Sequence, residues 1–306
     1  MLQILIAFIL SLGAVFFWAF FYFYYSPRFT TPRGTLFILF FGGIIAAVIA
    51  FFIEAEIFSF LPYGLNPFSF GQITIANPNE ALIIIFLIFV IFVPTEEIIK
   101  FLILKSIADR KYREMDQIID GLKFGLAVGL GFAFFENIIY FTVYMESLEK
   151  IDFLRLFFLR LFTSTLAHSL YSGFMGYFIA LAKFNRFYSK KFIQRGILGA
   201  IVFHGLYNIF LFTSFSFLSI ILLVLSLILI MRWYVDRRYL EITIQQGQAE
   251  AISLPFLASR PEFESILSKN KVSYNFIKSL NLCPFCLRKK IPKGDTCSYC
   301  SRKVVR

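Results

Sequence analysis

The stretch Phe92-Val-Pro-Thr-Glu-Glu-Ile-Ile-Lys-Phe101 decides how the rest of the sequence is understood. It places two adjacent carboxylates and a lysine inside an apolar run, residues 81–108, that is long enough to cross a membrane. A charged side chain at the centre of a bilayer costs about 2.5–3.5 kcal/mol on insertion scales. On a helix, Lys100 can reach either Glu96 or Glu97, because residues three and four apart are neighbours. The simpler interpretation is a structural ion pair between helices, and the alternative is a polar site inside the membrane.

The composition excludes a soluble globular fold. Of the 306 residues, 58% are hydrophobic and 20% are aromatic, and the mean hydropathy is +0.75. Because a soluble domain cannot bury so much apolar surface, the expected fold class is an all-α polytopic membrane protein. The net charge of +11 does not by itself indicate nucleic-acid binding. Most basic residues lie in short loops between apolar runs or in the C-terminal tail, a pattern typical of membrane topology.

Seven apolar runs reach, or nearly reach, the length of a membrane-spanning helix. They cover residues 2–24, 35–60, 81–108, 118–145, 153–182, 192–212 and 217–233. Glu54 and Glu56 lie near the end of the second run and are expected at the membrane interface. Arg155 and Arg160 lie early in the fifth run, where their side chains either extend towards the interface or belong to the interior.

Lysine and arginine are concentrated in the loops after the first, third, fifth and seventh runs. The positive-inside rule therefore predicts a multi-pass protein of the cell membrane, with its N-terminus outside and its C-terminus in the cytoplasm. We expect residues 1–235 to form the transmembrane domain, residues 236–280 a cytoplasmic linker and residues 281–306 a separate small domain.

Proline and glycine indicate where the helices bend and where they pack closely. Pro94 removes a backbone hydrogen bond just before the two glutamates and is expected to bend the third helix. Gly121, Gly125 and Gly129 follow one another at intervals of four residues in the fourth run. Small residues at this spacing allow two helix backbones to approach closely in a membrane.

Further polar residues lie deep in the fourth, fifth and sixth runs, where each is costly to bury. They are Glu136 and Asn137 in the fourth run, His168 in the fifth, and His204 and Asn208 in the sixth. His204 and Asn208 share one helix face because they are four residues apart. Four successive runs thus carry polar groups at similar depth, so we expect these groups to converge on one cavity.

These residue types allow more than one chemistry. A buried carboxylate can activate water as a general base, and histidine or asparagine side chains can donate to a developing oxyanion. Two histidines with a carboxylate also suffice for a catalytic zinc that keeps an open position. The same buried groups equally suit a proton-coupled or ion-coupled transporter.

Four spaced motifs lie on successive runs: Glu96-Glu97-x-x-Lys100, Phe132-x-x-x-Glu136-Asn137, His168-x-x-x-Ser172 and His204-x-x-x-Asn208. In this order they resemble the motifs of the PrsW family of intramembrane proteases, which is related to the CAAX prenyl proteases and their bacterial relatives. The resemblance covers residues 81–212. It implies hydrolysis of a peptide bond within or near the membrane, in a membrane-anchored protein such as an anti-sigma factor.

The resemblance also implies roles for individual residues. Glu96 is expected to be the general base on water and Glu97 to support it, while His204 and Asn208 hold a metal or stabilise the oxyanion. Lys100, Asn137 and His168 complete the candidate site. Glu136 stands where the CAAX proteases carry a histidine, so two mechanisms stay open. One is a metalloprotease in which Glu136, His168 and His204 hold a catalytic zinc, and the other is a glutamate-activated water without metal.

All four cysteines lie in the C-terminal tail, in the pattern Cys-x2-Cys-x10-Cys-x2-Cys. They are Cys283, Cys286, Cys297 and Cys300. Four thiolates at this spacing are typical of a structural zinc ribbon, whose closed site is not catalytic. The alternative is four free cytoplasmic thiols. The neighbouring lysines allow contact with a cytoplasmic protein, anionic lipid or nucleic acid, although a merely solvated surface is the more ordinary interpretation.

Overall fold

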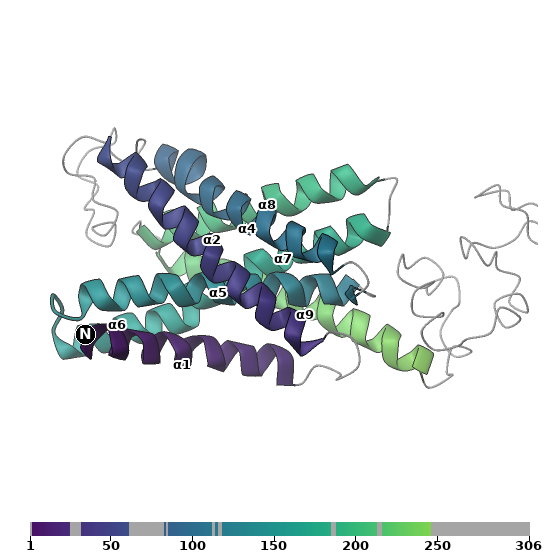
Figure 1. The fold of residues 1–306 in the computed structure, drawn as a ribbon, viewed down its shortest axis with the longest axis horizontal. Helices are drawn as coiled ribbons and strands as arrows, with labels where there is room; N and C mark the ends of the chain where they lie inside the picture. Colours follow the sequence, from purple (N-terminus) through teal and green to yellow (C-terminus); the bar gives the residue numbers. More distant parts are fainter. Residues whose placement is uncertain are drawn as a thin grey trace, which may run out of the picture.

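A computed structural model of the chain describes residues 2–24, 32–60, 83, 85–111, 114–115, 118–184, 188–212 and 216–245. All regular elements in these residues are helices, and most of them run roughly along the length of the molecule (Figure 1). The expected zinc ribbon, with its four cysteines, lies outside the described residues, so it stays a prediction.

The helices follow the apolar runs closely. They are α1 (Leu2–Tyr24), α2 (Arg33–Ser59), η2 (Leu87–Phe92), α4 (Val93–Arg110), α5 (Ile118–Tyr144), α6 (Lys150–Leu159), η4 (Arg160–Ser164), α7 (Thr165–Phe184), α8 (Ser189–Phe212) and α9 (Ser216–Gln245). One boundary differs from expectation. Helix α9 continues past Trp233 to Gln245, into residues that composition assigned to a linker.

Four helices in the described part of the chain are long and apolar enough to cross a membrane. They cover Leu2–Phe23, Arg33–Ile57, Ile118–Tyr144 and Ser216–Trp233. The other three expected spans are also helical, but they contain the π-helical segments and many of the buried polar groups. The protein is therefore an α-helical membrane protein, and the count of seven spans stays an expectation.

Two π-helical segments interrupt the long helices on either side of the cavity described below. In η2, the Val93 N–H donates to the Ile88 carbonyl, five residues back. In η4, the Thr165 N–H likewise donates to the Arg160 carbonyl. Pro94 lies in the first turn of α4, where a missing N–H costs least. The irregularity expected at Pro94 is therefore a π-helical turn that precedes it, a feature often found at functional sites.

Helix α5 is the centre of the fold, and 94% of its membrane-spanning window is buried inside the protein. Its glycines allow this. A Cβ atom added at Gly125 would stand 2.8 Å from the Gly173 Cα on α7, and one at Gly129 would stand 2.6 Å from the Ser169 Cα. The expected close approach at the glycine stripe is confirmed, and the neighbour is α7.

Helix α1 supports the segment that carries the polar site. It packs lengthwise against α5 (Figure 1). The Trp18 indole N–H donates to the Leu161 carbonyl in η4 at 2.7 Å, and the Tyr22 hydroxyl lies 2.9 Å from the Ser169 hydroxyl on α7. These two bonds fix the height of η4 and α7 beside α1.

Candidate active site

Five of the eight candidate site residues in the membrane line one cavity of about 200 Å³. They are Glu96, Glu136, His168, His204 and Asn208. The cavity lies between α2, η2 with α4, α5, η4 with α7, and α8. The other three, Glu97, Lys100 and Asn137, are fully buried next to the residues of the wall. The expected convergence of polar groups is therefore observed.

Lys100 is the centre of the first polar cluster. Its ammonium group donates to Glu97 Oε1 at 2.7 Å and to Glu96 Oε2 at 3.2 Å, as the helical spacing predicted. A third contact joins its Nζ to His168 Nδ1 at 3.0 Å. The same Nζ lies 3.7 Å from the centre of the Phe132 ring, so an aromatic face covers it. All three protons of the ammonium group thus have an acceptor.

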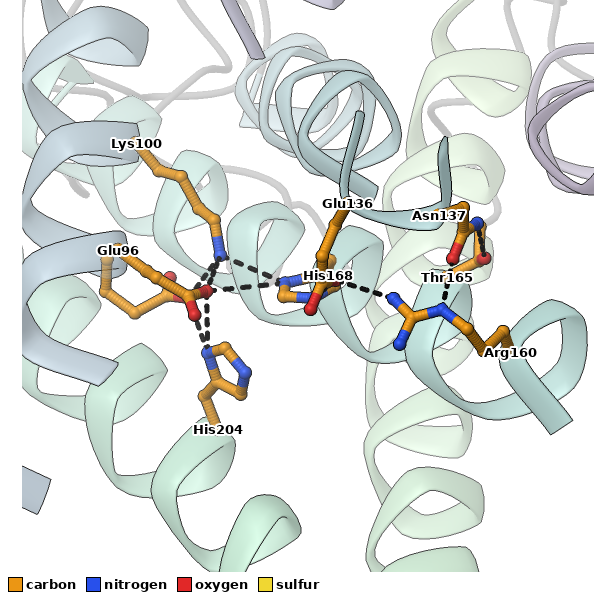
Figure 2. Close-up of polar contacts among 9 residues, drawn as sticks. Glu96, Lys100, Glu136, Asn137, Arg160, Thr165, His168 and His204 are labelled. Atoms are coloured by element: carbon orange, nitrogen blue, oxygen red, sulfur yellow. Dashed lines mark hydrogen bonds and ion pairs between the residues drawn. The ribbon is translucent and has the colours of Figure 1, made fainter. Parts of the chain in front are cut away.

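The contacts of His168 define its tautomer. An ammonium group has no acceptor atom, so His168 Nδ1 must accept the proton from Lys100. The proton of a neutral ring is then on Nε2, which donates to Glu136 Oε2 at 2.6 Å. His168 therefore connects the lysine on α4 with the carboxylate on α5 (Figure 2).

His204 is held by the buried carboxylate of Glu97. His204 Nδ1 donates to Glu97 Oε1 at 2.8 Å, and it lies 3.9 Å from Glu96 Oε2. In a neutral ring the second nitrogen, Nε2, then carries a lone pair. Glu97 therefore holds both Lys100 and His204, while Glu96, with 13% of its side chain exposed, is the carboxylate of this pair that reaches the cavity.

A second cluster is built around Arg160, which the sequence motifs did not single out. Its Nη2 pairs with Glu136 Oε2 at 2.9 Å, and its Nε donates to Asn137 Oδ1 at 2.6 Å (Figure 2). Asn137 in turn donates to the Thr165 hydroxyl at 2.9 Å. The guanidinium carbon lies 3.8 Å from the centre of the Tyr140 ring. Of the two interpretations of Arg160, the interior one is confirmed.

Arg155 differs from Arg160. It is exposed and pairs with Asp152 on the same helix at 2.9 Å. The sequence signal for Arg160 was an arginine without an evident partner in an apolar run. Only the neighbouring helix, which supplies Glu136 and Asn137, reveals its role.

Glu54 also lines the cavity, a position that the sequence did not indicate. Its expected location at the membrane interface stays a prediction. The residue comes from α2, on a wall formed by small and aromatic residues. Position along a helix predicts depth but not the direction of the side chain, so the sequence did not indicate that Glu54 faces the cavity. Its neighbour Glu56 is exposed.

The donor types at this site fit a divalent cation. Glu96, Glu97, His168 and His204 each offer a ligand atom, and these atoms lie within 4.8 Å of one another. Carboxylates and imidazoles are the usual zinc ligands besides thiolates. Lys100 binds three of these four side chains, so a metal ion here would have to share them with the ammonium group or displace it.

Comparison with known proteins identifies the family. The model of the PrsW family of intramembrane metalloproteases matches residues 31–234, about two thirds of the chain. The chain belongs to the PrsW family. The match includes every cavity-lining residue and leaves out α1 and the cysteine-rich tail.

Several members of the PrsW family are similar in sequence. Protease PrsW of Shouchella clausii is 34% identical over 122 residues, which is 40% of this chain and 52% of the relative. Protease PrsW of Oceanobacillus iheyensis is 32% identical over 112 residues, 37% of this chain and 48% of the relative. The chain thus spans about half the length of these two relatives. Protease PrsW of Clostridioides difficile is 29% identical over 160 residues, 52% of this chain and 64% of the relative. No solved structure matches the chain significantly.

Proposed function

We propose that the protein is an intramembrane protease that cleaves a membrane-anchored protein with a water molecule activated by Glu96. The observation that carries this proposal is the position of Glu96. Its carboxylate lines a cavity inside a membrane protein, beside a lysine and two histidines that complete a polar site. Membership of the PrsW family, and relatives named as proteases, support the reaction type.

In the proposed reaction, Glu96 takes a proton from water while the water oxygen attacks the carbonyl carbon of the scissile peptide. Glu96 then returns this proton to the leaving amine as the carbon–nitrogen bond breaks, so one carboxylate acts as base and then as acid. Lys100 donates to Glu96 and fixes the orientation of its carboxylate. Glu97 has a positioning role, because its contacts hold Lys100 and His204 in place.

The oxyanion needs a hydrogen-bond donor that faces the cavity. Asn208 is suited to this, because it lines the cavity on α8, one turn after His204. An amide N–H directed at a developing oxyanion contributes roughly 10²–10³-fold in rate in serine proteases. Glu136 and His168 complete the wall, and Arg160 with Asn137 keeps Glu136 in position.

A metal ion is compatible with this arrangement. If one binds, Glu96, Glu97, His168 and His204 are the residues that would hold it, and it would polarise the carbonyl and lower the pKa of bound water. The proposal itself needs only the chain's own groups, and the question is decided by measuring bound metal in the purified protein.

We infer that the cut lies towards the outer face of the membrane. The cavity is lined by the C-terminal halves of α2, α5 and α8. In the orientation expected from the loop charges, with the N-terminus outside and the C-terminus in the cytoplasm, these three helix ends lie in the outer half. The substrate is accordingly proposed to be a single-span protein, such as an anti-sigma factor, whose scissile bond lies near that surface. The cytoplasmic tail is proposed to hold a structural zinc and to bind a cytoplasmic partner.

A transporter that uses the same groups was the alternative, and membership of the PrsW family disfavours it. One experiment tests both. Wild type, Glu96→Gln and the matched control Glu56→Gln are reconstituted in liposomes with a pool of single-span proteins from the same cells, and new termini are sought by mass spectrometry. We expect termini with wild type and Glu56→Gln only. Equal activity of a folded Glu96→Gln protein would overturn the proposal, and ion flux without new termini would favour transport.

A further inference from the structure

The cavity wall formed by α2 has one acidic side chain for which the proposed reaction has no use. The residues of this wall repeat every three or four positions, so they form a single helix face. They are Ala47, Ala50, Phe51, Glu54 and Ala55. Glu54 is the polar member of an otherwise small and aromatic surface. Next to this wall, Phe132, Phe135 and Ile139 of α5 continue the apolar lining, and Phe132 and Phe135 pack against it.

Glu54 also differs from the other acids of the cavity in its partners. Glu96 pairs with Lys100 and Glu136 pairs with Arg160. For Glu54 the structure shows a buried oxygen, Oε1, without a hydrogen-bond partner. A buried polar atom without a partner carries a desolvation cost of about 1–3 kcal/mol, so such an atom in a native structure requires an explanation.

The other charged groups of the site also leave Glu54 available for a ligand. With neutral histidines, the described polar residues in and behind the cavity comprise the carboxylates Glu54, Glu96, Glu97 and Glu136 and the cations Lys100 and Arg160. Lys100 pairs with Glu96 and Glu97, and Arg160 pairs with Glu136, so neither cation is an ion-pair partner of Glu54. Glu54 does not belong to the group that could hold a metal ion. A single carboxylate on an apolar wall suits an elongated ligand that brings one cation among apolar groups.

We propose that Glu54 determines substrate specificity by binding a lysine or arginine side chain of the membrane segment that enters the cavity. This inference rests on the proposed function, because it takes the ligand to be a peptide. The apolar residues of the α2 wall would contact the apolar residues beside that basic side chain. The charge-assisted hydrogen bond to Glu54 would fix the register of the peptide relative to Glu96.

The test uses synthetic single-span peptides with one variable position, which is moved along the apolar segment and occupied by lysine, glutamine or glutamate. Each peptide carries a photoreactive benzophenone next to this position. Crosslinking is measured in liposomes with the full-length Glu96→Gln protein, so that binding is recorded whether or not the peptide is cut. Glu54→Gln and Glu54→Lys are added to this background, and Glu56→Gln is the matched control on the exposed part of the same helix.

We expect one position at which the lysine peptide crosslinks at least about tenfold more than the glutamine peptide, the order of effect of one charge-assisted hydrogen bond. Glu54→Gln should reduce this ratio to within about twofold, and Glu54→Lys should reverse it in favour of the glutamate peptide. Glu56→Gln should leave it unchanged. The inference is overturned if no position shows a lysine preference, or if the preference survives in Glu54→Gln. Cleavage of the same peptides by the protein with Glu96 intact tests the proposed protease function separately.

Discussion

Replacement of Gly129 by alanine should displace the backbone of α7 that carries His168, a residue of the candidate site. The added Cβ would stand 2.6 Å from the Ser169 Cα and 2.7 Å from the His168 carbonyl carbon. Ordinary van der Waals contact begins at 3.4 Å, so clearing the Ser169 Cα alone requires the backbone of α7 to retreat by about 0.8 Å, which is 3.4 Å minus 2.6 Å, and the His168 carbonyl oxygen lies closer still. Such overpacking lowers the free energy of unfolding by about 1–3 kcal/mol. The better helix propensity of alanine offsets at most about 1 kcal/mol of this loss.

The larger effect should be on activity, because His168 lies at the point of contact. A misplacement of about 1 Å at a catalytic site can cost about 10²-fold in rate, so we expect a loss between about tenfold and a hundredfold. The assay is cleavage in liposomes, with thermal unfolding in detergent measured beside it. The matched control is Gly13→Ala on α1, where nothing lies within 4 Å of the added atom. A Gly129→Ala protein with wild-type activity and stability would refute the close approach of α5 and α7.

Other substitutions test separate contacts. Lys100→Met leaves the buried Glu97 carboxylate without its cation and should lower the free energy of unfolding by about 3–5 kcal/mol, measured by denaturant titration; an unchanged midpoint would contradict the buried pair. Arg160→Lys loses the planar fork that joins Glu136 to Asn137, so the cleavage rate should fall at saturating substrate, whereas Arg155→Lys on the exposed surface should be neutral. Trp18→Phe removes the bond to the Leu161 carbonyl and should destabilise the fold by about 1–3 kcal/mol, with Phe17→Leu as an exposed neighbour for comparison. Partial burial works to raise the pKa of Glu114, but hydrogen bonds from Thr35 and Lys111 outweigh it and hold this pKa below its usual value. The ionised form therefore stabilises the fold at neutral pH, and this stabilisation is lost as the pH falls through the lowered pKa; Glu114→Gln should make stability less dependent on pH in that range.

Much of the site could be predicted from the sequence, because polar residues that are costly to bury in a membrane stand out in apolar runs. A glutamate or histidine in the middle of an apolar run is expensive, so Glu96, Glu136, His168 and His204 indicated a shared cavity before any helix was placed. The ion pair of Lys100 with both glutamates followed from helical spacing alone. The glycine stripe of α5 likewise predicted a close neighbour.

The rest depended on which helices meet. Arg160 and Glu54 are charged residues near helix ends. The direction of each side chain is decided by the packing of neighbouring helices and not by the local sequence. Asn137 was expected in the site, but it contacts Arg160 and Thr165 instead of lining the cavity. The π-helical turns carry no sequence signature beyond the nearby Pro94, since they arise from the fit between helices.

The π-helical turn η4 determines how the side chains of Arg160 and His168 are oriented relative to each other. Arg160 and His168 are eight residues apart, and eight steps of about 100° in a regular α-helix would leave their side chains about 80° out of line. A π-helical turn accommodates one extra residue. The two residues then relate as if seven apart, about 20° from alignment, and both reach Glu136. The turn thus sets the angle between the two side chains. Deletion of the exposed Phe162 should convert it to a regular α-helical turn with the two residues seven apart, so both side chains should stay about 20° from alignment and the site should be retained.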